Sequence, residues 1–395
     1  MPQHPRDDQA RPKRVPKASN ERQVRDLLER VFADDLHAKR VLSLAHATLG
    51  VLHAASLGIH AIGQGLAAAR GMDPKHTVKQ VDRLLSNAGI DVWGLFEFWV
   101  PFLVNERRQI VAALDWTEFD SDDHATIALH LITNHGRATP LLWKTVQKSA
   151  LKNQRNDFED ALLVKLREVL PPDVEVLILA DRGFADQKLF AFMKELQFHY
   201  LIRFRGNVYV TNAQGERRKA REWVSPSGRP VALPQASVTA DAYPVTTVVC
   251  VHDTEMKEAW CLATDVKMTG AMAVKRYGKR FTIEESFRDI KDERFGLGLG
   301  ATHIGDAGRR DRLILIAAMA VILLTLLGAA GEDLGFDRHL KANTVKRRTQ
   351  SLMKQGLFWY SALPNLREER FEPLMIRFGE LLAQHAIFKE TFGLV

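Results

Sequence analysis

Residues 174–181 read VEVLILAD, in which only Glu175 and the closing Asp181 are polar. A short and nearly continuous apolar run is typical of a strand that is buried on both faces, as at the centre of a parallel sheet. Asp181 would lie at the carboxyl end of this strand, where open α/β sheets bind their ligands. The stretch therefore predicts an α/β core with a polar site at the end of its central strand.

The sequence on either side extends this core. Residues 109–119 predict a first strand, on which Asp115 shares a face with Thr117 and Phe119. Beyond this strand, Asp122 and Asp123 fall in a polar turn, and we interpret them as solvated. Further strands are predicted over 125–133, 138–146 and 199–205, and helices over 155–170 and 186–196.

Residues 277–291, YGKRFTIEESFRDIK, contain no proline and predict one helix. At about 100° per residue, its charged side chains and its tyrosine fall within roughly 80° of one another. This stripe consists of Tyr277, Arg280, Glu284, Arg288 and Lys291. One carboxylate among cations suits a polyanion held beside a metal ion. An ordinary amphipathic helix with surface ion pairs is the alternative interpretation.

Three acids on separate elements are the candidate catalytic residues: Asp115, Asp181 and Glu284. Phosphodiester cleavage needs an acidified nucleophile and a stabilised leaving oxygen, and two divalent cations on shared carboxylates supply both. Carboxylate oxygens suit Mg²⁺. We therefore expect these three residues to bind two Mg²⁺ ions, for which Mn²⁺ can substitute. Taken singly, each aspartate could instead be a cap or a turn residue.

The spacing Tyr-x2-Arg-x3-Glu-x6-Lys at residues 277–291 resembles the YREK motif of bacterial insertion-sequence transposases of family four, which use Asp-Asp-Glu chemistry. The blocks DWT at 115–117, DRG at 181–183 and YLIRFRGN at 200–207 also resemble this family. The resemblance covers most of residues 105–330. It implies a ribonuclease H-like α/β core, formed by residues 105–206 and 265–332, that a β-rich insertion over residues 207–264 interrupts.

The resemblance also implies DNA contacts for individual residues. Phosphates of the transposon end would be held by Tyr277, Arg280, Arg288, Lys291 and Arg205. Arg203 shares a strand face with Arg205 and is an equal candidate. Trp260 resembles the family's tryptophan that stacks near a flipped base in hairpin-forming members. A core tryptophan at a strand edge is the alternative.

Residues 21–104 read as a helical module that we expect to bind DNA. Asp73 can cap a helix that begins at Pro74, and one face of that helix carries Lys75, Lys79 and Arg83. A basic helix after a turn suits a DNA groove, although a plain surface helix fits equally well. Residues 1–20 are expected to form a disordered basic arm, which either touches phosphates or is simply solvated.

The chain has 395 residues and a formal net charge of +7, which favours a polyanionic partner. Its two cysteines are too few for a disulfide framework, and its N-terminus is polar, so we expect a cytoplasmic protein. The family resemblance implies a bacterial protein that joins the nucleoid when bound to DNA. Residues 313–331 are apolar enough to span a bilayer, but we interpret them as a buried core helix, with no membrane partner. Residues 333–395 are expected to be helical and basic around Lys346, Arg347 and Arg348.

These observations predict a cut-and-paste transposase that binds terminal inverted repeats of DNA, acts as a homodimer on paired ends, and transfers the cut strand to target DNA. Two alternatives remain open. A ribonuclease H-like nuclease without strand transfer would need the same carboxylates but no module for the DNA ends. A non-catalytic DNA-binding protein derived from a transposase would tolerate loss of a carboxylate, yet all three are present.

Overall fold

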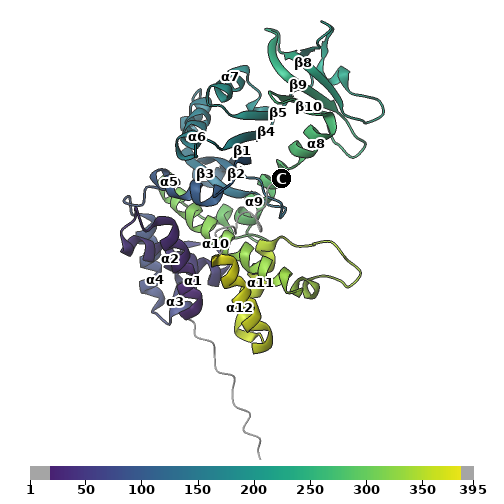
Figure 1. Cartoon of the computed structure of the whole chain (residues 1–395). Coiled ribbons are helices and arrows are strands. Elements are labelled where there is room, and N and C mark those ends of the chain that lie inside the picture. Colours follow the sequence, from purple (N-terminus) through teal and green to yellow (C-terminus); the bar gives the residue numbers. More distant parts are fainter. Residues whose placement is uncertain (1–17, 384–395) are drawn as a thin grey trace, which may run out of the picture.

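A computed structural model describes residues 18–383 as a central mixed sheet with helical regions before and after it (Figure 1). The N-terminal and C-terminal helices lie together at one end of the molecule, and the strands of the insertion lie at the other end. Most of the predicted N-terminal arm, residues 1–17, falls outside the described residues.

Five helices form the N-terminal region: α1 (Ala18–Phe32), α2 (Ala38–Ala54), α3 (Ile59–Arg70), α4 (Pro74–Leu85) and α5 (Val92–Val104). Helix α4 begins as the sequence predicts, because the Asp73 carboxylate accepts a hydrogen bond from the Lys75 backbone N–H at 2.7 Å. Its apolar side, including Val81, packs inward, and its basic side is exposed.

The core strands are β1 (Gln109–Phe119), β2 (His124–Leu131), β3 (Thr139–Gln147), β4 (Glu175–Ala180) and β5 (His199–Phe204). Strand β4 pairs in parallel with β1 on one side and with β5 on the other, which confirms its predicted central position. All five predicted core strands are present, and β1 has the predicted bounds.

Helices cover both faces of this sheet. Helices α6 (Arg155–Val169) and α7 (Gln187–Glu195) lie on one face, and α8 (Gly270–Gly278) and α9 (Phe281–Lys291) lie on the other (Figure 1). Along β4, Ile178 faces the larger core, which includes residues of α6 and α7, whereas Leu177 and Leu179 face a second core that includes residues of α8 and α9. This period of two explains why the whole strand is apolar.

The insertion continues the core sheet. Its strands are β6 (Tyr209–Thr211), β7 (Arg217–Lys219), β8 (Val231–Val238), β9 (Tyr243–Val251) and β10 (Trp260–Thr264). Strand β10 pairs antiparallel with β5, so one ten-stranded sheet has the order β3-β2-β1-β4-β5-β10-β9-β8-β6-β7. The sequence did not predict β7 or β8, because β7 consists of basic residues and β8 contains Pro234.

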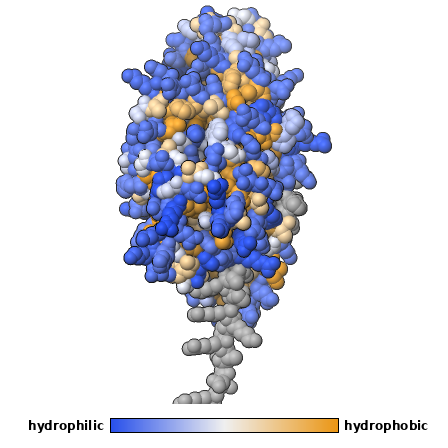
Figure 2. All heavy atoms as spheres, turned by 90° about the vertical axis from the view of Figure 1, so that its left-hand side faces the viewer, coloured by the Kyte–Doolittle hydropathy of each residue, from blue (hydrophilic) through white to orange (hydrophobic). Residues whose placement is uncertain are grey.

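The long apolar helix is α10 (Ala307–Asp333), and α11 (Leu352–Ala362) and α12 (Glu368–Ala383) pack against it. By length and composition α10 could cross a membrane, but 94% of its most apolar window is buried inside the protein, as predicted for a core helix. The face of the molecule in Figure 2 is mainly hydrophilic, with its apolar residues in separate patches.

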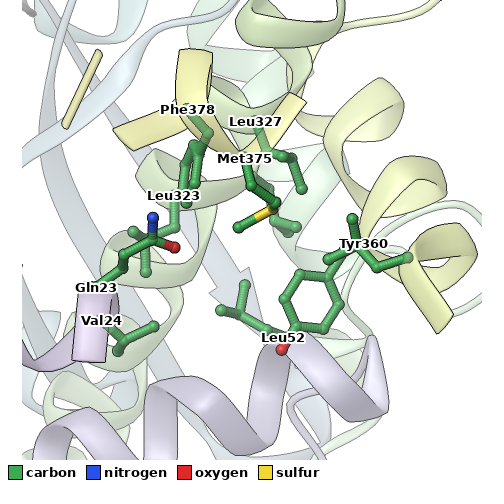
Figure 3. Close-up of a pocket in the computed structure, with 10 residues that line it drawn as sticks. Gln23, Val24, Leu52, Leu323, Leu327, Tyr360, Met375 and Phe378 are labelled. Carbon is green, nitrogen blue, oxygen red and sulfur yellow. The ribbon is translucent and has the colours of Figure 1, made fainter. Parts of the chain in front are cut away.

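A small apolar cavity of about 20 Å³ lies where the N-terminal helices α1 and α2 meet the C-terminal region (Figure 3). Leu52 of α2 and Phe378 of α12 reach it from opposite sides, and Leu323 and Leu327 line it from α10. Its place among buried apolar side chains makes it part of the packing between the two terminal regions.

Two predictions of helix extent are wrong. Residues 277–291 form two helices, because α8 ends at Gly278 and α9 starts at Phe281. The basic residues Lys346, Arg347 and Arg348 lie in an irregular segment before α11 and not in a helix. There, Arg348 forms an ion pair with Glu332 at 2.5 Å.

Candidate active site

Strand β1 places Asp115 toward helix α9. Alternation turns Thr117 to the same side, while Trp116 points the other way and its indole N–H donates to Glu159 of α6 at 2.8 Å. The Asp115 side chain is 20% exposed, and one of its oxygens accepts the Trp116 backbone N–H at 2.9 Å. Asp115 is therefore a half-buried carboxylate at a fixed position on the sheet.

Asp181 lies beside Asp115 because their strands run in parallel. Leu114 of β1 is in register with Ala180, the last residue of β4, so Asp115 within β1 lies beside Asp181 just after β4. The Asp181 carboxylate also accepts the Gly183 N–H at 2.8 Å, which starts a 3-10 turn over Arg182–Phe184. Parallel pairing thus brings together two acids that are 66 positions apart in the chain.

Arg280 joins the third acid to this pair. Its guanidinium donates to Glu284 at 2.6 Å and to Asp115 at 3.4 Å, and the arginine is only 5% exposed. Glu284 is half-exposed at the first turn of α9. The guanidinium therefore lies between two carboxylates and balances part of their charge.

Two of the acids act electrostatically on the third, Asp115. Burial raises the pKa of Asp115 to about 6, Arg280 opposes this rise, and the charges of Asp181 and Glu284 add to it. Asp115 is thus a carboxylate whose ionisation depends on both other candidates. Such a cluster of interacting acids beside buried cations is a common feature of functional sites.

Lys291, at the end of α9, reaches the same face of β1. Its ammonium donates to the Thr117 hydroxyl at 2.9 Å and to the Glu118 carbonyl at 2.7 Å, and it lies 4.6 Å from the centre of the Phe119 ring. Burial lowers the pKa of Lys291. The second cation of the predicted stripe is therefore placed along the strand that carries Asp115.

A family model for the transposase DDE domain matches residues 106–323, more than half of the chain. This chain belongs to the DDE transposase family. A search of curated proteins found no match. The matched region contains the whole ten-stranded sheet with Asp115, Asp181 and Glu284. The family implies a polynucleotidyl transferase or endonuclease that acts on DNA.

Other predicted contact residues of this transposase occupy different environments. Tyr277 is 1% exposed and packs in the second core, 5.1 Å from Trp260 between ring centres. Burial raises its pKa to about 12. Arg288 pairs with Glu285 at 2.8 Å and is exposed to solvent, whereas Arg280 and Lys291 both contact residues of β1.

Trp260 is half-buried, and Phe281 stacks on it with ring centres 5.6 Å apart. Phe281 is 37% exposed and also lies 4.6 Å from the Arg280 guanidinium. Phe281 was not among the predicted site residues, and the structure places it at the surface beside Arg280. Its position at the start of α9, next to Arg280, is the only sequence signal for this role.

The basic residues of α4 are exposed but lie on the N-terminal helices, at the other end of the molecule from the insertion (Figure 1); they are Lys75, Lys79 and Arg83. Arg205 is exposed just after β5. Its neighbour Arg203 and the unpredicted Arg182 both bind Glu258. Arg182 could have been found because it directly follows Asp181.

The prediction that Asp122 is solvated is wrong. Its side chain is 6% exposed and forms an ion pair with Arg310, which is fully buried at the start of α10. The Ile304 N–H also donates to this carboxylate, at 3.2 Å. Asp122 therefore fixes the turn after β1, and it is not a free ligand.

The donor chemistry of the three acids fits Mg²⁺, because all three supply carboxylate oxygens from separate, rigid elements. Within residues 18–383, however, no three acidic, histidine or cysteine side chains are already arranged around a common point that a metal could fill. The Arg280 guanidinium lies between Asp115 and Glu284 in this arrangement.

Proposed function

We propose that this transposase is a cut-and-paste enzyme of the YREK group, with Asp115, Asp181 and Glu284 as its catalytic carboxylates. The observation that carries the proposal is that the buried Arg280 pairs with Asp115 and Glu284, while parallel strand register brings Asp181 beside Asp115, on a face that Lys291 also reaches. Cations beside an acidic site suit a substrate whose phosphates approach those acids.

Two Mg²⁺ ions on these carboxylates would acidify the attacking water and stabilise the leaving oxygen. Arg280 is suited to hold a phosphate in bidentate fashion once it leaves Glu284, and Lys291 is suited to a single charged contact. Arg280 is buried and Lys291 is half-buried. A phosphate that binds them would therefore replace its water contacts with contacts to protein N–H donors, whose attraction is stronger away from water.

The proposed reaction begins when water attacks the phosphodiester at the transposon end and releases a 3′-hydroxyl. This hydroxyl attacks the opposite strand to form a hairpin and releases the flanking DNA, and water then hydrolyses the hairpin and frees the 3′-hydroxyl again. The same hydroxyl finally attacks target DNA. The exposed edge of Phe281 over Trp260 supports the hairpin step, because a stacked aromatic pair offers a surface for an extruded base.

Sequence-specific binding to the inverted repeats is assigned to the N-terminal helices. The exposed basic face of α4, which follows a capped turn, supports this assignment. Arg205 would contact the DNA backbone near the sheet. Pairing of two transposon ends would require a homodimer, and the reaction would take place in the bacterial cytoplasm, at the nucleoid.

Strand transfer is the property that separates a transposase from a simple nuclease. The test uses purified protein, Mg²⁺, a labelled fragment carrying the inverted repeat that flanks its gene, and an unlabelled target plasmid. We expect nicked, hairpin and plasmid-joined products, resolved on denaturing and native gels. Cleavage without joined products would favour the nuclease, and binding without cleavage would favour the non-catalytic alternative.

A further inference from the structure

Two arginines converge on one carboxylate oxygen next to the candidate active site. Arg182 donates to Oε2 of Glu258 at 2.9 Å, and Arg203 donates to the same oxygen at 2.7 Å. Arg182 follows Asp181 at the end of β4, Arg203 belongs to β5, and Glu258 lies in the turn between β9 and β10. Three separate segments therefore meet at a single anionic oxygen.

Arg203 is anchored more firmly than an ordinary surface cation. The Arg203 side chain is 17% exposed and also donates to the Ala259 carbonyl at 3.1 Å, while its Nε is buried with no hydrogen-bond partner among the described residues. Arg182 and Glu258 are about half-exposed. One donor is thus held rigidly by the protein, and the acid that it binds lies on the solvent side.

This cluster borders the acids of the active site. The charges of Arg280, Arg203 and Asp181 all influence the pKa of Tyr277. Arg203 therefore lies near the same residues as the catalytic candidates. Glu258 lies two residues before Trp260, whose ring packs on Tyr277. A strand of DNA that enters the carboxylate cluster would therefore pass close to Arg182 and Arg203.

We propose that Arg182 and Arg203 form a binding site for a DNA backbone phosphate, and that Glu258 occupies this site until DNA displaces it. The inference rests on the proposed function, because it needs DNA at the active site. Guanidinium groups bind phosphate oxygens with charge-assisted hydrogen bonds. Arg182 and Arg203 share a single oxygen of Glu258, whereas a phosphate would offer each arginine an acceptor oxygen of its own.

Glu258 is placed to leave without unfolding the sheet. It lies in the turn of residues 252–259, outside the paired residues of β9 and β10. Half-exposed ion pairs are screened by water and salt, so the carboxylate is a weak competitor. Glu258 would thus act as an internal mimic of the phosphate, reducing DNA affinity and keeping the two arginines oriented.

The test compares Glu258→Gln with Glu255→Gln, an equal charge change in the same turn, where Glu255 is exposed. Affinity for a short fluorescein-labelled duplex is measured by anisotropy over a series of salt concentrations. We expect Glu258→Gln to bind roughly three- to tenfold more tightly than wild type, because a competing anion is lost, and Glu255→Gln to change affinity much less.

A second variant, Arg182→Gln, tests the cationic side at a half-exposed position that the fold tolerates. Loss of one phosphate contact should reduce the slope of log K against log salt by about 0.9. Thermal unfolding of each variant verifies that it is folded. Equal affinities for Glu258→Gln and Glu255→Gln, or an unchanged slope for Arg182→Gln, would overturn the inference.

These outcomes separate the inference from the function on which it rests. A wild-type protein that cleaves DNA, while Glu258→Gln behaves like Glu255→Gln, contradicts the phosphate site alone. A wild-type protein that does not bind the duplex at any salt concentration contradicts the transposase mechanism, and the phosphate site falls with it.

Discussion

Replacing Asp122 by Asn should destabilise the protein far more than the same change two residues earlier. Asp122 pairs with Arg310, whose exposed fraction is zero, and the pair connects the turn after β1 to the start of α10. Removing one partner of a buried ion pair leaves a desolvated charge and typically costs about 3–5 kcal/mol. Asn can still accept the Ile304 N–H, and Arg310 keeps its contact with His124 at 3.1 Å, so we expect about 3 kcal/mol.

Asp120→Asn is the matched control. Asp120 pairs with Lys148 at 2.6 Å, but its side chain is 82% exposed, and surface pairs of this kind contribute little to stability. Urea unfolding would be followed by tryptophan fluorescence and by far-ultraviolet circular dichroism. We expect a clearly lower urea midpoint for Asp122→Asn and a midpoint near that of wild type for Asp120→Asn.

The reasoning would be refuted if both variants unfolded at the same urea concentration as wild type. That result would mean that Arg310 is compensated by its other neighbours, including the Phe119 ring at 4.0 Å, without the carboxylate. A large loss in Asp120→Asn alone would contradict the burial argument directly.

Three further predictions concern packing, charge and pH. Burial raises the pKa of Asp311 from 3.8 to about 7, so the native state holds the proton more tightly and the free energy of unfolding should fall as pH rises from about 4 to about 7. Asp311→Asn can still accept the Thr145 N–H but cannot ionise, so urea unfolding across this range should lose a pH dependence of about 4 kcal/mol. Gly356→Ala would press a methyl group onto the Leu324 carbonyl where α11 crosses α10, and should lower the free energy of unfolding by about 1–3 kcal/mol; an unchanged melting temperature would contradict this close packing. Lys291→Met keeps the apolar stem but loses the charge, so cleavage should slow markedly while the melting temperature stays near that of wild type; an unchanged cleavage rate would remove Lys291 from the site.

Much of the sheet was predictable because its signals are local. The bounds of β1 follow from alternation, and the double burial of β4 follows from its uniform apolar content. The positions of Asp115 and Asp181 at one edge then follow from the fold that the family resemblance implied.

The remaining features depend on distant partners. Asp122 looks solvated until Arg310, 188 positions later, is placed against it. The hydrogen bonding of β10 to β5, which joins the insertion to the core sheet, has no local signature. Helical spacing placed Arg288 with Arg280, but Arg280 pairs with Asp115 of β1, 165 positions earlier in the chain, while Arg288 stays exposed beside Glu285. In each case a contact between distant segments overrides the local pattern.

Cleavage of labelled transposon-end DNA by Glu284→Gln, with Glu285→Gln as the adjacent control, tests the central claim most directly. Both glutamates lie on α9, but only Glu284 binds Arg280, whereas Glu285 pairs with Arg288 and Arg137. With Mg²⁺ present, we predict that Glu284→Gln binds the DNA without cutting it and that Glu285→Gln still cuts. Cleavage by Glu284→Gln at the wild-type rate would contradict the assignment of Asp115, Asp181 and Glu284 as the catalytic acids.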